Sequence, residues 1–539
     1  MKPMVMANTD AEFEAADQAV WTEMARRILK GAAPDSLDRT DEDGLVTRAL
    51  YPVDAPDARA ATAHLLPAFP HRRLVEGWQV CQPVGSDAAN ADIHEALGSG
   101  ATALLLQSGA PAEIGQLLDD VVLTAVGLEG EAATPAHYRT IIERANARGE
   151  AADRLDLDAG LDVLTQADEG LALHAAAPAG HRLFRIDGWA QHNLGLTAAQ
   201  ELGYVLAGVA ELFRAAESAG IAPADIAGRV SVRLALPADM FAGIAACRAM
   251  RRLWDGMLLA CGIDPVPVRI EGFASLRMMS VLDHEVNMLR TTTALLGGAI
   301  GGADAMAGFG HDLLTGETPG ARRTARLAQV LMMAESEIAR SLDPAAGAPF
   351  IESRTDDLAD AGWSAFQEIE CAGGLTAAIK AGMIQAQAAA AATAREARMR
   401  AGEELLGVTL QPTGGMPPEI LAAFSAVRRP AACVEVLRRR TAEFSPRILI
   451  LRGATDNAVA EERGIRRWLG MAGLQAVTLD AGSGSALSDA RPDIVIGCGL
   501  AALPEGVEAG NFRSAAAILD AGDRIAALED LLVQKGDAR

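Results

Sequence analysis

Short apolar runs, each followed by a loop and a helix-like stretch, recur through the central part of the chain. A continuous apolar run of this length predicts a strand buried on both faces of a parallel sheet, because neither face needs polar residues. We expect such strands at 78–82, 101–106, 121–126, 183–186, 230–236, 266–270 and 303–308, with a less distinct eighth near 170–175.

Strands that alternate with helices in this way predict parallel βαβ units, and about eight units close a (β/α)8 TIM barrel. We assign this barrel to residues 61–356 and an extended arm to residues 1–60, with an amphipathic helix at 12–30. The glycine-rich run at 297–302 lacks the lysine of a phosphate-binding loop. It is interpreted as a helix end that turns into a barrel strand.

The last third of the chain has two further patterns. Residues 357–444 predict a helical linker region, and residues 445–539 predict a small doubly wound, flavodoxin-like domain. The fold class is therefore α/β, a TIM barrel followed by a small second domain. The expected linker helices span 357–380 and 385–400, the Pro/Gly-rich segment spans 407–418, the last three strands span 448–451, 476–479 and 493–496, and the last helices span 458–470 and 523–534.

Composition narrows the function classes. A chain of 539 residues exceeds one core, so two or three domains are expected. Its net charge of −23 argues against nucleic-acid binding, which needs Lys and Arg. No apolar run approaches the ~18 to 20 residues of a membrane span, and the N-terminus lacks an apolar signal core. Six dispersed cysteines without a CxxC pair argue against disulfides or a zinc cluster, so a cytoplasmic protein is predicted.

Common catalytic motifs are missing from the sequence, and the histidines are unevenly placed. The chain has no GxxxxGK[ST], GxSxG or HExxH pattern. None of its nine histidines lies after His311. The C-terminal domain therefore has no imidazole to offer a metal, and we expect no metal site on this chain.

Long stretches of the chain resemble the methylmalonyl-CoA mutase family. The barrel signature is carried by SLRMMSVLDHEVNMLRTTTALLGGAIGGADAM at 275–306 and supported by similar runs at 252–262, 325–355 and 363–385. LDRTDEDGLVTRALYPVDAPD at 37–57 resembles the family's N-terminal arm. The resemblance implies a barrel whose axis accepts the pantetheine tail of an acyl-CoA. It also implies a C-terminal domain that carries adenosylcobalamin, and a radical rearrangement of methylmalonyl-CoA to succinyl-CoA.

The cobalamin loop of the family reads DxHxxG, where the histidine is the lower axial cobalt ligand and the aspartate orients it. On this alignment Asp456 keeps the aspartate, Ala458 replaces the histidine and Glu461 replaces the glycine. Alanine has no lone pair for cobalt, and glutamate does not readily adopt a positive φ. The family's later Ser-x-Leu falls on 498–500, and a strand after it is expected to be missing. The resemblance thus implies a degenerate loop and no cofactor on this chain.

Catalytic positions of the barrel are replaced as well. The family's Gly-Tyr-His motif, whose histidine bonds the thioester carbonyl, becomes a run that ends in Ala190. The family's Arg-Gln-Tyr-Ala-Gly run aligns with residues 80–84 of this chain. Cys81 is among the lost positions there, and only Gln82 is kept. The His-x-Gln-Thr-Ser-Gly run becomes 269–274. His192 follows Ala190 by two residues and is interpreted as a hydrogen-bonded loop histidine. The alternative is that, at a strand end, it points the same way as Ala190 and replaces the lost histidine.

Other family positions favour structural roles. Asp283, Asn287 and Arg290 keep the family's Asp-x-x-x-Asn-x-x-Arg spacing, which would put all three on one helix face. A structural ion-pair network there is favoured over a catalytic role. For Arg277, a CoA-phosphate contact and a solvated surface charge remain equally open.

This pattern of losses resembles the small (beta, non-catalytic) subunit of heterodimeric bacterial mutases. The resemblance implies a catalytic large subunit as partner, with adenosylcobalamin bound by that partner. One alternative is a divergent, active acyl-CoA mutase that holds cobalamin without a histidine ligand. Another is a free-standing regulatory or chaperone module. Sequence leaves open whether the barrel still admits an acyl-CoA.

Overall fold

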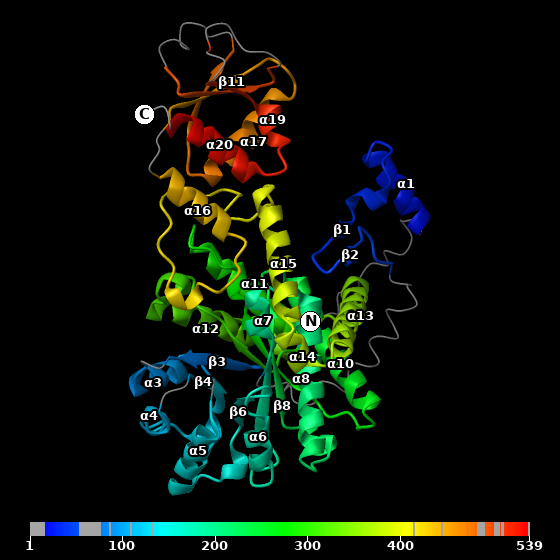
Figure 1. Ribbon diagram of the computed structural model, residues 1–539, viewed down its shortest axis with the longest axis vertical. Helices are drawn as coiled ribbons and strands as arrows, with labels where there is room; N and C mark the ends of the chain where they lie inside the picture. Colours follow the sequence, from blue (N-terminus) through cyan, green and yellow to red (C-terminus); the bar gives the residue numbers. More distant parts are fainter. Residues whose placement is uncertain are drawn as a thin grey trace, which may run out of the picture.

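The computed structural model describes residues 17–52, 77–85, 88–107, 110–131, 133–412, 415–442, 446–481, 491–500, 507 and 511–536. The molecule is elongated, with the barrel at one end and a small sheet at the other (Figure 1). Helices α15 (Met383–Arg400) and α16 (Ala432–Thr441) lie between them. Among the described residues, no helix has the length and apolarity needed to cross a membrane.

The central domain is a closed barrel of eight parallel strands, in the order β10-β3-β4-β5-β6-β7-β8-β9. This confirms the predicted barrel. The strands are β3 (Gln79–Val84), β4 (Ala103–Gln107), β5 (Gly127–Glu131), β6 (Leu157–Asp162), β7 (Arg182–Asp187), β8 (Val230–Leu236), β9 (Arg269–Ala274) and β10 (Ala305–Ala307). Their buried apolar side chains form one core with the surrounding helices. Because residues 53–76 lie outside the described part, the start of the predicted barrel range is not covered by this description.

Two strand predictions were wrong. The run at 121–126 forms a loop with a 3-10 turn (Leu123–Ala125), and β5 begins only at Gly127. The run at 170–175 lies within α6 (Ala167–His174), and the strand it was expected to supply is β6. Strand β6 was missed because Asp158 interrupts its apolar pattern, although this aspartate is fully buried inside the barrel.

Helices surround the barrel and bury its outer face. They are α3 (Asn90–Gly98), α4 (Pro111–Leu117), α5 (Pro135–Ala147), α6, α8 (Ala198–Ser218), α10 (Met240–Ala260), α11 (Val286–Gly301) and α12 (Pro319–Ala334), with α13 (Pro349–Cys371) against α8 and α10. The glycine-rich run ends α11 as predicted, because Gly302 caps it at φ +85° and β10 follows. Gly301 is needed for packing, since a Cβ there would stand 3.0 Å from Cα of Ile244 on α10.

The described part of the N-terminal arm begins with α1 (Gln18–Ile28), inside the predicted helix; residues 12–16 of that prediction lie outside the described residues. The arm continues as a small antiparallel hairpin of β1 (Arg39–Thr40) and β2 (Val46–Thr47). Its turn carries three consecutive acids, Asp41, Glu42 and Asp43. Figure 1 shows α1 standing away from the barrel, with the hairpin between α1 and the barrel helices.

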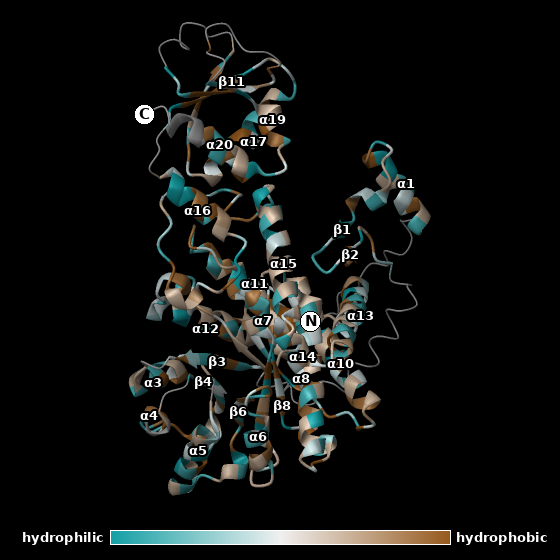
Figure 2. Cartoon of the chain, in the orientation of Figure 1, coloured by the Kyte–Doolittle hydropathy of each residue, from teal (hydrophilic) through white to brown (hydrophobic). Residues whose placement is uncertain are grey.

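The C-terminal domain is a four-stranded parallel sheet in the order β12-β11-β13-β14. Three strands were predicted, and the fourth, β14, was missed because it is only three residues long. The strands are β11 (Ile448–Arg452), β12 (Ala476–Asp480), β13 (Ile494–Cys498) and β14 (Phe512–Ser514), and the helices are α17 (Ala458–Met471), α19 (Ala515–Leu519) and α20 (Arg524–Gly536). The central β11 is strongly hydrophobic (Figure 2). Met399, Val434 and Leu437 of the linker helices share one core with this sheet.

Candidate functional site

Charged side chains from five consecutive strands meet inside the barrel. We call Glu131, Asp158, Arg185, Arg233 and Glu271 the axial cluster; they come from β5 to β9. Nε of Arg185 lies 2.9 Å from Oε2 of Glu271, and Nε of Arg233 lies 3.1 Å from the same oxygen. Asp158 Oδ1 lies 3.5 Å from Arg185 Nη2, and Arg233 Nη1 donates to Glu131 Oε2 at 2.6 Å.

Two opposing effects act on the pKa values of the carboxyl groups in this cluster. Burial raises the pKa, and the neighbouring arginines lower it. Burial raises the pKa of Glu271, and Glu129 adds to this rise, whereas Arg185 and Arg233 work against it. For Glu131, burial also favours the neutral form, but Arg233 and Arg185 outweigh it and its pKa is lowered. The cluster therefore pairs opposite charges inside the barrel, with Glu131 partly exposed and the other four side chains buried.

A second group of polar side chains crosses the barrel nearer to the strand starts. We call Gln79, Glu129, Asp156, Arg182 and Arg269 the basal ring. Arg182 pairs with Asp156, and Gln79 Nε2 donates to Asp156 Oδ2 at 2.7 Å. Arg269 Nη2 lies 2.8 Å from Oε1 of Glu129. Arg182 Nε lies 3.5 Å from Asp158 Oδ2, which connects the ring with the axial cluster.

The carboxyl-terminal mouth of the barrel is filled by aromatic rings. Trp189 lies 5.8 Å from Phe273 and 5.9 Å from Phe309, and these two phenylalanines are 6.3 Å apart between ring centroids. The guanidinium of Arg233 lies 4.1 Å from the Phe273 ring centroid, so the aromatic group rests directly on the axial cluster. Trp189 also donates its indole N–H to the Ala274 carbonyl at 3.0 Å.

The two lost catalytic positions lie beside this filled axis. Cys81 is buried on β3, and its Sγ is 3.4 Å from Oε2 of Glu129. Burial, followed by Glu129 and Glu271, raises the pKa of the Cys81 thiol, which therefore stays protonated. Ala190 lies in α7 (Gly188–Leu194), and its backbone N–H is capped by Asp187 Oδ1 at 2.8 Å.

His192 does not share the direction of Ala190, because both lie on helix α7 rather than at a strand end. Residues two apart on a helix point to different sides. The His192 Nδ1 lies 3.1 Å from Oε2 of Glu201, and its Nε2 lies 2.9 Å from Oγ of Ser275. All three side chains are buried, with Ser275 only 1% exposed, so this serine–histidine–glutamate chain has no access for a substrate. His192 is a hydrogen-bonded core histidine.

Arg277 is not the solvated surface charge that one of its two interpretations predicted. Its guanidinium donates to the carbonyls of His192 and Leu196 at 3.1 and 2.7 Å, and Nη2 lies 3.2 Å from Oε1 of Glu42. Only 11% of the side chain is exposed. Arg277 therefore joins the N-terminal arm to the mouth of the barrel.

The family positions Asn287 and Arg290 share one face of α11, whereas Asp283 lies in the turn before the helix at φ +49°. The Asn287 amide accepts from Ser280 N–H at 3.0 Å and donates to its carbonyl at 2.8 Å. Arg290 donates to Asn287 Oδ1 at 2.6 Å and to the Leu406 carbonyl at 2.6 Å. These contacts fasten the linker region to the barrel.

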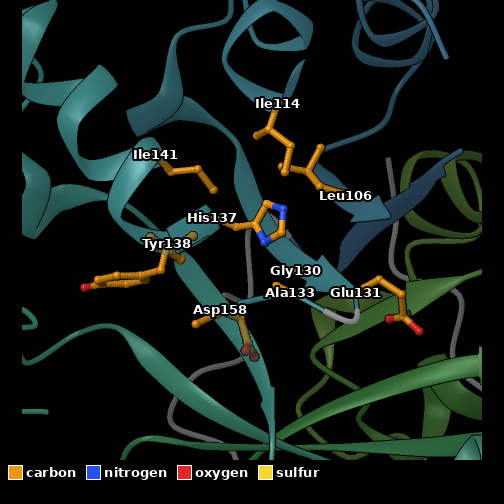
Figure 3. A pocket seen from close by; sticks show the side chains of 11 residues that line it. Leu106, Ile114, Gly130, Glu131, Ala133, His137, Tyr138, Ile141 and Asp158 are labelled. Atoms are coloured by element: carbon orange, nitrogen blue, oxygen red, sulfur yellow. The ribbon is translucent and has the colours of Figure 1, made fainter. Parts of the chain in front are cut away.

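A small cavity lies between strands β4 to β6 and helices α4 and α5. Figure 3 shows the His137 ring near its centre, with Leu106, Ile114 and Ile141 around it. Its volume is about 10 Å³, which is space for one water molecule at most. The His137 ring is held by the backbone N–H of Thr134, which donates to its Nδ1 at 2.9 Å. This cavity is too small for a substrate.

In the C-terminal domain, the degenerate loop follows β11 and is closed by contacts of its own. Helix α17 begins at Ala458, which is 1% exposed, while Asp456 is exposed in the turn. Glu461 lies within α17 and therefore needs no positive φ; its Oε2 accepts from the Gly499 N–H at 2.6 Å. A Cβ built on Gly499, whose φ is +65°, would stand 2.8 Å from Cβ of Ala458. Helix and strand thus touch where a ligand would enter.

These residues do not fit a cobalt ligand set. Ala458 offers no donor atom, Asp456 has no histidine to orient, and the sequence holds no histidine after His311. Within the described ranges, no three His, Cys, Asp or Glu side chains come together as a metal site would require.

The axial cluster was missed in the sequence, although a signal was present. Arg185, Arg233 and Glu271 each interrupt an apolar run, as in RLFRID and VSVRLAL. A single charge inside an apolar barrel strand indicates that its side chain is paired within the barrel, because an unpaired buried charge is too costly. The partners come from other strands, so their pairing required the structure.

Fold and site together define a (β/α)8-barrel protein with a second parallel-sheet domain. Residues 174–412 match the family model described as methylmalonyl-CoA mutase. A relative from Mycobacterium tuberculosis, named as a probable methylmalonyl-CoA mutase small subunit, is 34% identical over 520 residues, which span 86% of this chain and 83% of the relative. The small subunit of Streptomyces virginiae is 34% identical over 440 residues, spanning 74% of this chain and 71% of the relative. The chain belongs to the methylmalonyl-CoA mutase family.

Proposed function

We propose that this chain is the non-catalytic small subunit of a methylmalonyl-CoA mutase. It would bind and support a catalytic large subunit, which holds adenosylcobalamin and isomerises methylmalonyl-CoA to succinyl-CoA. The observation that carries the proposal is the filled barrel axis. The names of the two relatives, which describe small subunits, support the existence of a large partner.

The filled axis leaves no path for a pantetheine tail. Four of the five side chains of the axial cluster, those of Asp158, Arg185, Arg233 and Glu271, are at most 4% exposed, whereas the side chain of Glu131 is 31% exposed. To open the axis, Arg185 and Arg233 would have to leave Glu271. Breaking a buried ion pair costs about 3 to 5 kcal/mol when a partner is left uncompensated. An acyl-CoA would therefore have to offset a large penalty before it gained any contact.

The C-terminal domain supports the same conclusion. Its strand order β12-β11-β13-β14 supports a flavodoxin-like fold, in which ligands bind at the carboxyl ends of the central strands. In this chain that position holds the hydrogen bond between Glu461 and Gly499 and the contact of Ala458 with Gly499. The domain would then be kept for its surface and its packing rather than for a cofactor.

The complex is proposed to reside in the cytoplasm. All six cysteines are free thiols, which suits a reducing compartment. Three of them, Cys81, Cys247 and Cys498, are buried and have raised pKa values because of burial.

The proposal is tested by co-expression with a mutase large subunit whose DxHxxG and Gly-Tyr-His motifs are intact. We expect a one-to-one complex whose cobalamin and activity are lost when the large subunit is omitted. The large subunit alone should be less stable or less active than the complex. The proposal fails if the two chains never co-elute and omission of this chain leaves mutase activity unchanged.

A divergent active mutase is the competing function. It predicts that the purified chain alone takes up adenosylcobalamin with a changed visible spectrum and converts methylmalonyl-CoA. Absence of both at micromolar cofactor would exclude it. No contact within the described residues favours this alternative.

A further inference from the structure

The N-terminal arm meets the rest of the chain through the acids in the turn of its hairpin. We call Asp41, Glu42 and Asp43 the acidic turn. All three residues are partly buried, although the two strands that flank them are mostly exposed. The backbone N–H groups of Asp43 and Leu45 donate to Asp41 Oδ1 at 3.0 and 2.9 Å, so this side chain fixes the shape of the turn.

Two of the three acids are paired with arginines from separate parts of the fold. Asp41 meets one arginine on the barrel helix α13. Glu42 meets one arginine directly after β9 at 3.2 Å and two on the linker helix α15, the more distant of them at 3.7 Å. These arginines are Arg354 for Asp41, and Arg277, Arg395 and Arg398 for Glu42. The acidic turn therefore fastens the arm to the barrel and to the linker at one place.

Helix α15 connects these ion pairs with the C-terminal domain. Figure 1 shows α15 running from the barrel toward that domain, with the hairpin of the arm beside it. Met399 of α15 belongs to the core that contains the C-terminal sheet. Arg400 Nε lies 2.7 Å from Oδ2 of Asp523, just before α20. Docking of the arm thus braces the helix that carries the C-terminal domain.

Asp43 is bound differently from the other two acids. Its Oδ1 accepts the backbone N–H of Ala199 at 3.2 Å, and its carboxylate also accepts a hydrogen bond from the Thr197 side chain. Both residues lie at the start of α8. Among the residues that the structure describes, no arginine, lysine or histidine forms an ion pair with Asp43. Its carboxylate is therefore held only by neutral donors.

Most of the charges that face Asp43 oppose its ionisation. They come from the turn itself, from α8 and from the segment after β9, and they are Asp41, Glu42, Glu201 and the single cation Arg277. Burial raises the pKa of Asp43 from 3.8 to about 6, and the charges of Asp41 and Glu42 also raise it. The hydrogen bonds from Thr197 and Ala199 lower this pKa, but burial outweighs them.

We propose that the acidic turn is a proton-sensitive latch, which holds the arm against the barrel and α15 more firmly at pH 5 than at pH 7.5. The arginine pairs of Asp41 and Glu42 hold the arm, and Asp43 makes the hold depend on protons. A carboxyl whose pKa is raised by docking stabilises the docked arm at low pH, and this stabilisation is lost as pH rises from 3.8 through 6. The latch is formed within this chain, so it does not rest on the proposed subunit role.

The test is hydrogen exchange of the hairpin amides in the purified full-length chain, measured by mass spectrometry at pH 5 and pH 7.5. A two-stranded hairpin is marginally stable by itself, so its amides should exchange when the arm is released. Asp43→Asn cannot ionise at this position. Relative to this variant, protection in the wild-type chain should fall about tenfold between pH 5 and pH 7.5, as expected for a carboxyl whose pKa moves from 3.8 to about 6.

The comparison of two proteins at the same pH removes the pH dependence of the intrinsic exchange rate. Parallel pH dependence of protection in the wild-type chain and in Asp43→Asn would overturn the proton sensitivity. Unchanged protection of the barrel strands is expected in both proteins, because the substitution lies outside the barrel core. A loss of protection there would overturn the assignment of Asp43 to the arm contact alone.

A second variant tests the hold itself. Asp41→Asn removes the pair with Arg354 and keeps Asp43, so it should lower the protection of the hairpin amides by about fivefold or more at both pH values. Asp35→Asn is the matched control, because Asp35 is exposed on the arm outside the acidic turn. It should behave as the wild-type chain does. Equal protection in Asp41→Asn and Asp35→Asn would overturn the role of the acidic turn in holding the arm.

Discussion

Arg233 and Glu271 meet inside the barrel, with Nε and Oε2 3.1 Å apart and both side chains at most 1% exposed. Arg185 bonds the same carboxylate from the neighbouring strand β7, so one glutamate holds two arginines. In this chain the axis of the barrel is thus a structural element. The closure of this axis depends on Glu271, because Glu271 pairs with both arginines.

Glu271→Gln should destabilise the barrel strongly. The variant keeps the shape of the side chain but leaves Arg185 and Arg233 without their shared charge. We expect a loss of about 3 to 5 kcal/mol in the free energy of unfolding, because an uncompensated buried charge is costly. Chemical denaturation of the purified chain measures this loss. Glu143→Gln, an exposed glutamate on α5, is the matched control and should change stability by less than about 0.5 kcal/mol. A loss that small in Glu271→Gln would contradict the argument.

Restoring the cobalamin motif with Ala458→His and Glu461→Gly should not restore cobalamin binding. A histidine at 458 would have to occupy the space against Gly499, and the glycine would remove the hydrogen bond that Glu461 accepts there. Overpacking of a buried position costs about 1 to 3 kcal/mol, so the C-terminal domain should become less stable.

The measurement for this double variant is the visible spectrum of adenosylcobalamin after gel filtration with the protein. Ala460→His, at an exposed position of α17, is the control for the added imidazole. Stoichiometric cobalamin retained by the double variant, but not by Ala460→His, would show that the domain is a complete cobalamin site that lacks only these two residues.

The sequence predicted those features that depend on neighbouring residues, and it missed those that depend on residues far apart in the chain. The eight-strand barrel, the α11 glycine cap and helix α17 were predicted correctly, because apolar runs and capping glycines are local signals. Strand β6 was missed, since Asp158 breaks its pattern and the arginines that face this carboxylate, Arg182 and Arg185, lie on another strand. His192 is hydrogen-bonded as expected, but it lies on helix α7 and not at a strand end. The contacts of Arg277 were not predicted, because its partner Glu42 lies 235 residues away on the N-terminal arm.

The N-terminal arm should detach more readily when Glu42 is neutralised. Glu42 pairs with Arg277 near the barrel mouth and with Arg395 on α15. In Glu42→Gln both arginines keep their bonds to backbone carbonyls, so the fold should survive while the arm loosens. We expect limited proteolysis of the arm to become about 5- to 30-fold faster, corresponding to roughly 1 to 2 kcal/mol. Glu23→Gln on the exposed face of α1 is the control. Equal cleavage rates for both variants would show that Glu42 does not hold the arm.

The buried pair of His192 and Glu201 should make stability depend on pH between 7 and 8. Burial is the main reason why the pKa of Glu201 is raised to about 8. The charges of Asp187 and Asp43 also raise this pKa, whereas the hydrogen bond from the Ala235 N–H and the charge of Arg277 lower it. Burial, then Arg277 and Arg395, lowers the pKa of His192 well below 6.5, so this imidazole stays neutral. The Glu201 carboxyl is thus protonated in the folded chain at pH 7 and ionised in the unfolded chain.

A carboxyl whose pKa is raised by folding stabilises the fold at low pH, and this stabilisation is lost as pH rises from 4.5 toward 8. Between pH 7 and 8 an unfolded histidine is mostly neutral, so within this pair it is Glu201 that contributes the loss, of about 1 kcal/mol. Glu201→Gln cannot ionise and should lack this loss, while its amide can still bond His192 and the Ala235 N–H. The measurement is the difference in unfolding free energy between the two proteins at pH 7 and pH 8, with Glu143→Gln as control. Parallel pH dependence in all three proteins would show that Glu201 is ionised in the folded chain.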